Sequence, residues 1–437
     1  MIYHYEWVSD MKNTIQSVKG TRDFYPEEMA VRSWMYEMIK DVSSQFGYQE
    51  YDGPFLEKID LYAAKSGEEL VKEQSFVFQD RSGEEITLRP ELTPTLARMV
   101  AQKQNQLVFP LRWWSFGPFW RYERPQKGRT REFFQWNIDL IGEDSAEADA
   151  ELLAVCIYFF QKTGLTPTQV NILVNDRKLM DSELTALGIS TELKRTVFRL
   201  IDRKEKMPSA EWHKYGLESG LSEAQMQGVE SLLTNQELWK KSPDLTRLFE
   251  ILEEMDIIEY VRFDPQIIRG LEYYTGIVFE AKDQDREGRS VLGGGHYGNL
   301  VADVGGEPLA GVGFAMGDVM AGIVLEKYGC LPKFEASPAL VMVTVFDDTL
   351  LPKSYAIANK LRLSGIKTSV YPSAAKLQKQ FKYADRLGAR YVVVMGPDEE
   401  KAGQATIKNL STREQTTVGQ NELAQELTKL LANASAV

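Results

Sequence analysis

The segment LRWWSFGPFWRYERPQKGRTREFFQWNIDLIG, residues 111–142, predicts a long β-hairpin. Its two arms, 112–123 and 133–142, are rich in aromatic and β-branched residues, which favour strands. The polar stretch 124–132 between them contains a proline and a glycine, as is typical of a connecting loop. We therefore expect two antiparallel strands along this segment.

Side chains alternate between the two faces of a strand, so the hairpin gathers polar groups on one face. Arg121 and Glu123 share a face of the first arm, and Phe133, Gln135 and Asp139 share a face of the second. Burying a cation, two carboxylates and an amide together is costly unless a ligand or mutual partners satisfy them. The pattern indicates either a ligand-binding face or an exposed face held by salt bridges.

The connecting loop is strongly cationic. Within eight residues it carries Arg124, Lys127, Arg129 and Arg131, and Gly128 allows it to bend. Guanidinium groups suit phosphates because their forked donors match two oxygens at once. The loop is either a phosphate-binding element or a solvated turn.

Helix and strand signals continue on both sides of the hairpin. The spacing of apolar residues predicts helices at 26–47, 93–103 and 145–164, with a further helix from about residue 317. Strand signals lie at 48–56, 169–174, 274–281 and 290–294. Residues from about 180 to 262 are helical, charged and poor in strand signals, and we interpret them as an inserted helical module.

The last hundred residues form a different pattern. Beyond a short linker at 332–338, strands and helices alternate as βαβαβ, and two short strands and a helix from about residue 421 follow. This order indicates a small α/β domain with a largely parallel sheet. Residues 337–437 carry a net charge of +4, whereas the remainder carries −16. A stripe of cations on one helical face is either solvated or a surface for a polyanion: Lys376, Lys379, Lys382 and Arg386.

Composition excludes several classes of protein. The chain has 437 residues, 43% of them hydrophobic, which is enough for two or three domains with real cores. Two cysteines cannot supply a disulfide framework or a cysteine-based zinc site. The longest apolar run, LLAVCIYFF at 152–160, is far shorter than the roughly 20 residues that span a bilayer. The first ten residues do not resemble a signal peptide, so we expect a cytoplasmic protein.

Several segments together resemble one family. Residues 119–142 resemble motif 2 of class II aminoacyl-tRNA synthetases, in the form seen in histidyl-tRNA synthetases. TLRPELT (87–93) is similar to the amino-acid-binding segment of that family, and IIRGLEYYTGIVFE (267–280) matches a signature of its histidyl branch. KGTRDFYPEE (19–28) and GGGHYGNLV (293–301) also fit. The C-terminal part looks like the anticodon-binding domain of class IIa synthetases.

The resemblance implies a fold and a reaction. We expect an N-terminal lead-in at 1–16 and an α+β catalytic core with an antiparallel sheet at 17–331, which contains the helical insertion at about 180–262. An anticodon-binding α/β domain at 337–437 would follow. The implied reaction is ATP-dependent ligation of L-histidine to its tRNA through a histidyl-adenylate intermediate, with Mg²⁺ as cofactor and a homodimer as the assembly.

The resemblance also implies roles for individual residues. Arg121 and Arg269 are the expected catalytic residues, because attack by an ionised carboxylate needs no general base but does need charge neutralisation at the α-phosphate. The expected ATP site contains Arg121, Glu123 and Phe133. The expected histidine site contains Glu91, Thr93, Arg121, Gln135, Asp139, Arg269, Tyr273 and Tyr274. The expected tRNA contacts are Gln126, Lys127 and Arg129.

One position departs from the family pattern. The helix after GVGFAMG (311–317) usually begins with an arginine that grips the γ-phosphate, but Met320 occupies that place. His296 or a loop arginine could supply the missing cation. The departure favours an alternative, a non-catalytic regulatory paralogue that binds histidine, whereas Gln135, Asp139 and the C-terminal domain favour the enzyme. A synthetase for another amino acid is a third possibility, which the pairing of Asp139 with Tyr274 argues against.

Overall fold

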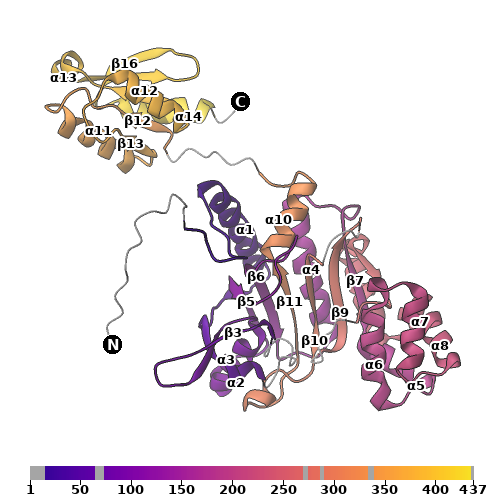
Figure 1. Ribbon diagram of the computed structural model, residues 1–437. Coiled ribbons are helices and arrows are strands. Elements are labelled where there is room, and N and C mark those ends of the chain that lie inside the picture. The colour runs from indigo at the N-terminus through magenta and orange to yellow at the C-terminus, as the bar shows by residue number, and fades with distance from the viewer. Residues whose placement is uncertain (1–14, 64–72, 269–273, 286–289, 333–338, 435–437) are drawn as a thin grey trace. The chain divides into compact units, whose positions relative to one another are not determined.

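A computed structural model describes residues 15–63, 73–268, 274–285, 290–332 and 339–434. The chain folds as two compact units, Met1–Pro332 and Lys333–Val437, drawn in Figure 1. Each unit has hydrophobic clusters of its own.

The first unit is built on a sheet of eight strands in its described part. The strands follow the order β1 (Gln49–Glu50), β5 (Leu111–Trp120), β6 (Glu132–Ile141), β11 (Gly311–Gly317), β10 (Leu292–Tyr297), β9 (Tyr274–Asp283), β7 (Val170–Asp176) and β8 (Val261–Phe263). All neighbouring pairs are antiparallel except the two outermost pairs, β1–β5 and β7–β8. The predicted hairpin is confirmed as β5 and β6, which lie inside this sheet, although the first strand ends at Trp120 and not at residue 123 as predicted.

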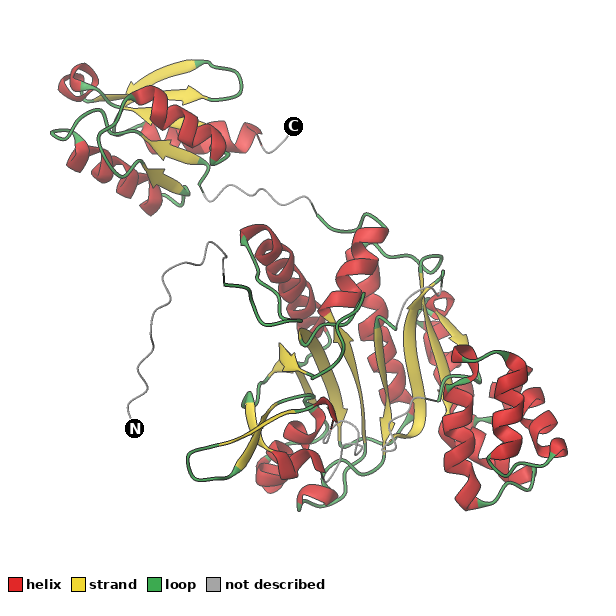
Figure 2. Cartoon of the chain, in the orientation of Figure 1, coloured by secondary structure: helices red, strands yellow, loops and turns green. Residues whose placement is uncertain are grey.

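Helices cover both faces of the large sheet (Figure 2). On one face α1 (Pro26–Gln45), α4 (Ala146–Thr163) and α10 (Asp318–Lys327) bury the main core with inward residues of β5 and β6 such as Trp114 and Trp136. On the other face α3 (Thr93–Lys103) packs through Leu96 and Val100. Helix α4 has sharp ends, because the Ser145 hydroxyl accepts a hydrogen bond from its first turn and Gly164, at φ 87°, closes its last.

The helical insertion lies between β7 and β8. It comprises α5 (Arg177–Ala186), α6 (Thr191–Asp202), α7 (Ser209–Glu218), α8 (Glu223–Thr234) and α9 (Pro243–Glu254). Figure 1 shows α5 to α8 gathered as a bundle beside the sheet, whereas α9 packs directly against α4. A short 3-10 turn, Lys204–Lys206, follows α6 and reaches the site described below.

A second, three-stranded sheet was not anticipated from the sequence. It has the order β2 (Leu56–Lys58), β4 (Glu85–Leu88), β3 (Phe76–Gln79), and α2 (Ile59–Ala63) follows β2. The strand signal at 48–56, which Pro54 interrupts, corresponds to two short strands, because only 49–50 and 56–58 are strands there. Gly53 and Pro54 separate the two pieces, and a Cβ at Gly53 would lie 2.3 Å from the Thr95 methyl group.

The second unit has a five-stranded sheet with the order β13-β12-β14-β15-β16 in its described residues. Its strands are β12 (Val341–Val343), β13 (Thr368–Val370), β14 (Tyr391–Val394), β15 (Gln404–Asn409) and β16 (Gln415–Gly419). The first three are parallel and the last two antiparallel. Its helices are α11 (Leu351–Leu363), α12 (Leu377–Arg386), α13 (Pro397–Ala402) and α14 (Leu423–Ala434). The predicted fold class, an α+β core with a helical insertion and a C-terminal α/β domain, is confirmed.

None of the helices in the described ranges is both long enough and apolar enough to cross a membrane.

Candidate active site

A cavity of about 660 Å³ lies in the first unit, against the loop end of the β5–β6 hairpin. Its walls come from the hairpin, the strands β9, β10 and β11, the start of α10, the end of α6 with the turn after it, and residues 266–268. The predicted residues Arg121, Glu123, Arg129, Phe133 and Gln135 all line it. Of the residues that the hairpin pattern grouped, Arg121, Glu123, Phe133 and Gln135 line the cavity and Asp139 does not. Arg121 and Glu123 follow the end of β5 at Trp120.

Arg121 ties the hairpin to the TLRPELT segment. Its Nε donates a hydrogen bond to the Pro90 carbonyl at 2.9 Å, and its guanidinium lies 5.3 Å from the centre of the Phe133 ring. Glu123 is buried and forms an ion pair with Arg129 across the connecting loop. The hairpin therefore presents a cation whose position is fixed beside an aromatic ring, an arrangement suited to a nucleotide.

Asp139 lies farther along β6 and is only 6% exposed. It faces Gly313 of β11 in the sheet register, and a Cβ at Gly313 would lie 2.1 Å from its Oδ1. The Tyr297 hydroxyl donates a hydrogen bond to Oδ1 at 2.8 Å. Burial raises the pKa of the Asp139 carboxyl to about 7, although this hydrogen bond opposes the shift. Near neutral pH the carboxyl is therefore poised between its two protonation states.

Tyr274 starts β9 and pairs with Tyr297 of β10 in the sheet register. A Cβ at Gly295 would lie 2.8 Å from the Tyr274 ring, so the close packing of this ring requires glycine there. Asp139 and Tyr274 are thus joined through Tyr297, although neither borders the cavity itself. The sequence did not assign a role to Tyr297, because its partner is 158 residues away.

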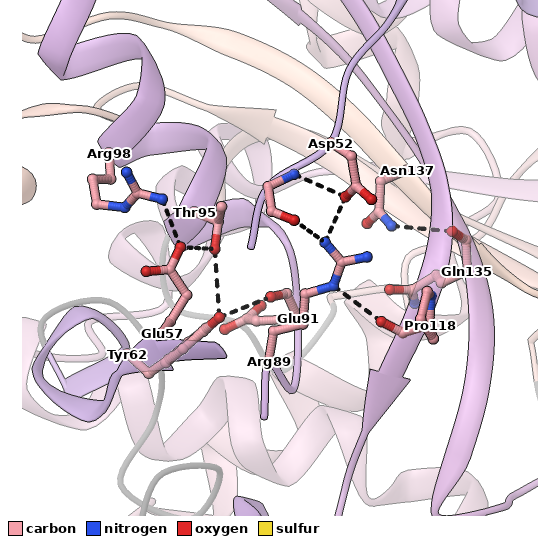
Figure 3. A network of polar contacts seen from close by, with 11 residues as sticks. Asp52, Glu57, Tyr62, Arg89, Glu91, Thr95, Arg98, Pro118, Gln135 and Asn137 are labelled. Atoms are coloured by element: carbon pink, nitrogen blue, oxygen red, sulfur yellow. Dashed lines mark hydrogen bonds and ion pairs between the residues drawn. The ribbon is translucent and has the colours of Figure 1, made fainter. Parts of the chain in front are cut away.

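The TLRPELT segment is held by an arginine that the sequence reasoning missed. Arg89 is fully buried between the rings of Phe55 and Phe119, at 4.7 and 4.6 Å. It donates hydrogen bonds to Asp52 at 2.6 Å and to the Pro118 carbonyl at 3.0 Å (Figure 3). An arginine inside an otherwise apolar strand end was the available signal.

The predicted ligands Glu91 and Thr93 sit just beyond Arg89, where the segment enters α3. The Glu91 carbonyl accepts a hydrogen bond from the Tyr62 hydroxyl at 3.4 Å, within the network of Figure 3. Thr93 is the first residue of α3. Neither residue lines the cavity. Their role in binding a substrate ammonium stays a prediction.

The start of α10 is joined to the hairpin at the cavity. Asp318 accepts a hydrogen bond from the Phe134 backbone at 2.9 Å and pairs with Arg22 at 2.7 Å. Met320 lines the cavity, and its sulfur would lie 2.4 Å from a Cβ at Gly128. Gly128 adopts a φ of 77°, a conformation that favours glycine. The Met320 thioether therefore packs against the hairpin loop at the position where the family pattern has an arginine.

The suggestion that His296 supplies the missing cation is wrong. The His296 side chain is 3% exposed and points to α4, where its ring nitrogens lie 3.2 Å from Asp149 and 3.0 Å from Asp144. Burial lowers its pKa, but the hydrogen bond and charge of Asp149 outweigh burial and raise it overall. His296 does not border the cavity, whereas the loop arginine Arg129 does.

Some predicted residues are not tested by the geometry. Arg269, Tyr273 and residues 1–14 of the lead-in lie outside the described residues. Gln126 and Lys127 are exposed at the tip of the hairpin loop, which two backbone hydrogen bonds between Gln126 and Arg129 close. Their contact with tRNA stays a prediction.

The described residues contain no group of three or more His, Cys, Asp or Glu that could hold a metal. One carboxylate at the cavity, Glu280, accepts a hydrogen bond from the Ser290 hydroxyl at 2.5 Å. Mg²⁺ is usually bound by one or two carboxylates together with substrate phosphates. The residues present therefore fit an ion that arrives with a nucleotide.

The motif-bearing hairpin and the glycine-containing strands meet at one cavity of a largely antiparallel sheet, a combination that defines the catalytic core of a class II aminoacyl-tRNA synthetase. Residues 20–318 match the family model of histidyl-tRNA synthetase, and residues 339–430 match that of the anticodon binding domain. The chain belongs to the histidyl-tRNA synthetase family.

Relatives match along nearly the whole chain. The histidine–tRNA ligase of Leptospira biflexa is 34% identical and aligns over 97% of this chain and 100% of its own length. That of Pyrococcus horikoshii is 35% identical over 95% of this chain and 99% of its own. The crystal structure of histidyl-tRNA synthetase from Nostoc sp. PCC 7120 superposes with a TM-score of 0.78 at 25% identity, covering 96% of this chain and 100% of that one.

Proposed function

We propose that the chain ligates L-histidine to its tRNA in two steps. In the first, a carboxylate oxygen of histidine attacks the α-phosphorus of ATP, which gives histidyl-adenylate and releases pyrophosphate. In the second, a hydroxyl of the terminal ribose of the tRNA attacks the carbonyl carbon of the adenylate and releases AMP. Membership of the family and the full-length match to histidine–tRNA ligases support this assignment.

The hairpin residues carry the first step. Arg121 neutralises charge on the α-phosphate as the bond to pyrophosphate breaks, and the family resemblance assigns Arg269 to the same phosphate. We assign Phe133, whose ring stacks against that of Phe119 at 5.9 Å, to the adenine. Glu123 orders Arg129 at the cavity wall. No general base is required, because the attacking carboxylate is already ionised at neutral pH.

The single observation that carries the assignment to histidine is the buried cluster of Asp139, Tyr274 and Tyr297. An imidazole offers one nitrogen donor and one acceptor, and the Asp139 carboxyl, poised near pH 7, can complement either. A competitor without a ring nitrogen would desolvate Asp139 further and offer it no hydrogen bond in addition to that from Tyr297, which disfavours binding. Glu91, Thr93 and Gln135 receive the substrate ammonium in this proposal.

The pyrophosphate end of ATP is held without the usual arginine. Four cations line the cavity in the described part of the chain: Arg121, Arg129, Lys206 and Lys282. Lys282 pairs with Glu205 at 3.4 Å, and Lys206 pairs with Asp202 at 2.8 Å. Arg129 lies directly beside Gly128 and Met320, so we assign it to the β- and γ-phosphates, with Mg²⁺ sharing the charge.

The test is ATP–pyrophosphate exchange by the full chain with each amino acid in turn. Exchange that depends on histidine alone supports the proposal. Exchange with another amino acid, and none with histidine, would refute the assignment of Asp139. Arg269→Ala should lower exchange strongly without unfolding the protein, and exchange within a few-fold of the unmodified chain would refute the role of Arg269.

A second candidate function rests on Met320. A regulatory paralogue would bind histidine without activating it, and the loss of a phosphate-binding cation is the kind of change expected in such a protein. The second unit, which matches the anticodon binding domain, argues for a tRNA partner instead. Measurable histidine binding without any exchange would favour the regulatory function.

The assembly we propose is a homodimer in the cytoplasm, where tRNA and ATP are available. The three-stranded sheet and the loop before it leave four large apolar side chains about half exposed: Phe55, Leu56, Val77 and Phe78. A cluster of this kind indicates a protein–protein contact, and we assign it to a second copy of this chain.

A further inference from the structure

One residue of β10 interrupts the regular pairing of the sheet. Gly295 and Tyr297 of β10 pair with Val278 and Tyr274 of β9, so a step of two residues along β10 matches a step of four along β9. The residue inside this irregularity is His296. An irregularity of this kind re-aims the side chains beside it, so the regular ladder alone does not fix the backbone at this point.

The side chain of His296 anchors this point to a helix. His296 is 3% exposed, and its Nδ1 lies 3.2 Å from a carboxylate oxygen of Asp149, in the first turn of α4. Its Nε2 lies 3.0 Å from Asp144, just before α4. On the neighbouring strand, a Cβ at Gly276 would lie 3.1 Å from the Cβ of His296, so β9 also packs closely against it. His296 therefore ties β10 to α4 at a tightly packed point.

The charges around His296 favour its protonated form. Burial alone would lower its pKa, but the hydrogen bond and charge of Asp149 and the charge of Asp144 raise it overall, and Lys178 of α5 opposes them. Lys178 is itself paired with Asp244 of α9 at 3.1 Å. Removal of either member of a buried ion pair is costly, because the other charge is then uncompensated. The link between His296 and Asp149 is therefore a strong constraint on β10.

Both chain neighbours of His296 shape the imidazole cluster, which consists of Asp139, Tyr274 and Tyr297. The Tyr297 hydroxyl donates a hydrogen bond to Asp139 Oδ1 at 2.8 Å. Gly295 leaves the space that the Tyr274 ring occupies, because a Cβ there would lie 2.8 Å from the ring. A shift of β10 at His296 would therefore displace two of the contacts that define the cluster, although His296 does not border the cavity.

We propose that His296 is a positioning residue for histidine binding. Its link to Asp149 fixes the course of β10 and thereby holds Tyr297 against Asp139, where the substrate imidazole binds. The effect is confined to the amino acid, because the residues assigned to ATP lie on the hairpin and not on β10. The inference rests on the proposed function, since it takes histidine as the substrate.

The first test is ATP–pyrophosphate exchange by the full chain. His296→Gln should raise KM for histidine about tenfold and leave KM for ATP within about twofold, because only the imidazole cluster loses its support. Asp149→Asn should have the same effect, and the double variant should be no worse than the worse single one, because both residues act through one contact. Lys327→Met is the matched control, since it breaks an ion pair between α10 and Asp283 at the far end of β9. Both of its KM values should stay within about twofold of those of the unmodified chain.

The pH dependence of KM distinguishes positioning from general support of the fold. In the unmodified chain KM for histidine should rise at alkaline pH as His296 loses its proton, because its pKa lies above the ordinary value. His296→Gln should lack this rise. Asp139 also titrates, but it is present in both chains, so the difference between the two pH profiles reports on His296.

The second test is NMR of the full chain with isotope-labelled histidine residues. The sequence has three histidines, His4, His213 and His296, so the signal missing from His296→Gln identifies that residue. Unlabelled L-histidine at saturation should shift the His296 signal, because its imidazole binds beside Tyr297. The signal of His213, on α7 of the helical insertion, should not move.

The proposal is overturned if His296→Gln leaves KM for histidine within about twofold, or raises the KM values for histidine and ATP equally. Additive effects of His296→Gln and Asp149→Asn also overturn it, as does a His296 signal that does not respond to histidine. If His296→Gln does not fold, His4→Gln and His213→Gln identify the His296 signal by elimination, and its response to histidine decides the proposal. Absence of histidine-dependent exchange in the unmodified chain would instead refute the proposed function, and the same NMR response would still decide the role of His296.

Discussion

Asp139 shows how strongly burial can change the pKa of one side chain in a site. The sheet places it against Gly313, and the Tyr297 hydroxyl is the hydrogen-bond partner of its Oδ1. An ordinary aspartate on a strand would be fully ionised at neutral pH, but burial raises the pKa of this carboxyl to about 7. The group can therefore accept a proton from a substrate imidazole or donate one to it.

Replacement of Asp139 by asparagine should have a pH-dependent effect on stability. The carboxyl pKa is 3.8 in its ordinary state and about 7 when folded, so folding takes up a proton between these values. The buried carboxyl thus destabilises the native protein increasingly as pH rises from about 4 to 7. The free energy of unfolding of Asp139→Asn, measured relative to that of the unmodified chain, should therefore rise by up to about 4 kcal/mol between pH 4 and pH 8. Urea unfolding at both pH values measures this, and an equal difference at both would contradict the assigned pKa.

Replacement of Arg129 tests how the triphosphate is held. Arg129→Ala should raise KM for ATP in exchange without tRNA about tenfold or more, because a charge-assisted contact is lost. Arg129→Lys should be less affected, since it keeps a charge beside the buried Glu123. Arg124→Ala is the control, because Arg124 is exposed on the same loop and does not line the cavity. A defect confined to aminoacylation would place Arg129 on the tRNA instead.

Alternation could place Phe133 and Gln135 on one face of β6, because period two depends only on local geometry. Arg121, Glu123, Phe133 and Gln135 do line one cavity. Arg89 could not be found this way, since its role depends on partners 29 and 37 residues away. The face that His296 occupies could not be predicted, because the expected strand ended at residue 294, whereas β10 continues to Tyr297 with an irregular register between Gly295 and Tyr297.

At the level of elements, the glycines of β10 and β11 shape the imidazole cluster. Each removes a side chain where another residue needs the space: Gly313 for Asp139 and Gly295 for Tyr274. The register of β6, β11, β10 and β9 then brings Asp139, Tyr297 and Tyr274 to one place. The geometry of these strands therefore determines the imidazole cluster as much as its polar residues do.

Gly313→Ala should raise KM for histidine more than KM for ATP. The added methyl group would lie 2.1 Å from Asp139 Oδ1 and 2.9 Å from the Ile138 carbonyl, so Asp139 must move. We expect KM for histidine to rise about tenfold or more and stability to fall by about 1–3 kcal/mol. Gly322→Ala on α10 is the matched control, because nothing lies within 4 Å of its added Cβ. Exchange kinetics and thermal unfolding measure both effects, and equal KM values for the two variants would argue against the cluster.

The sequence predicted elements well where the pattern is local. Helices α1, α3 and α4 and the β5–β6 hairpin have clear periodicity or turn residues at their ends. Strand β11, GVGFAMG, was missed because glycine is a poor strand former and its place depends on β6 and β10. The short strands β2, β3 and β4 were missed or misplaced for a similar reason, because half-exposed apolar residues give no alternation.

For the whole molecule, the exposed apolar side chains of the three-stranded sheet predict association. Phe78→Asp should convert a dimer of twice 49.7 kDa into a monomer, because a charge at a buried contact is costly. Val108→Asp is the control, since Val108 is 85% exposed and lies outside that sheet. Light scattering after size exclusion measures the mass. A monomeric unmodified chain, or an unchanged mass for Phe78→Asp, would contradict the proposed interface.

The most direct test of the central claim is a crystal structure of the full chain with histidinol and ATP. The account predicts that the imidazole lies within hydrogen-bond distance of the Asp139 carboxyl, with the α-phosphate on Arg121 and the adenine on Phe133. The account would be contradicted if the imidazole bound elsewhere and Asp139 kept only its hydrogen bond from Tyr297.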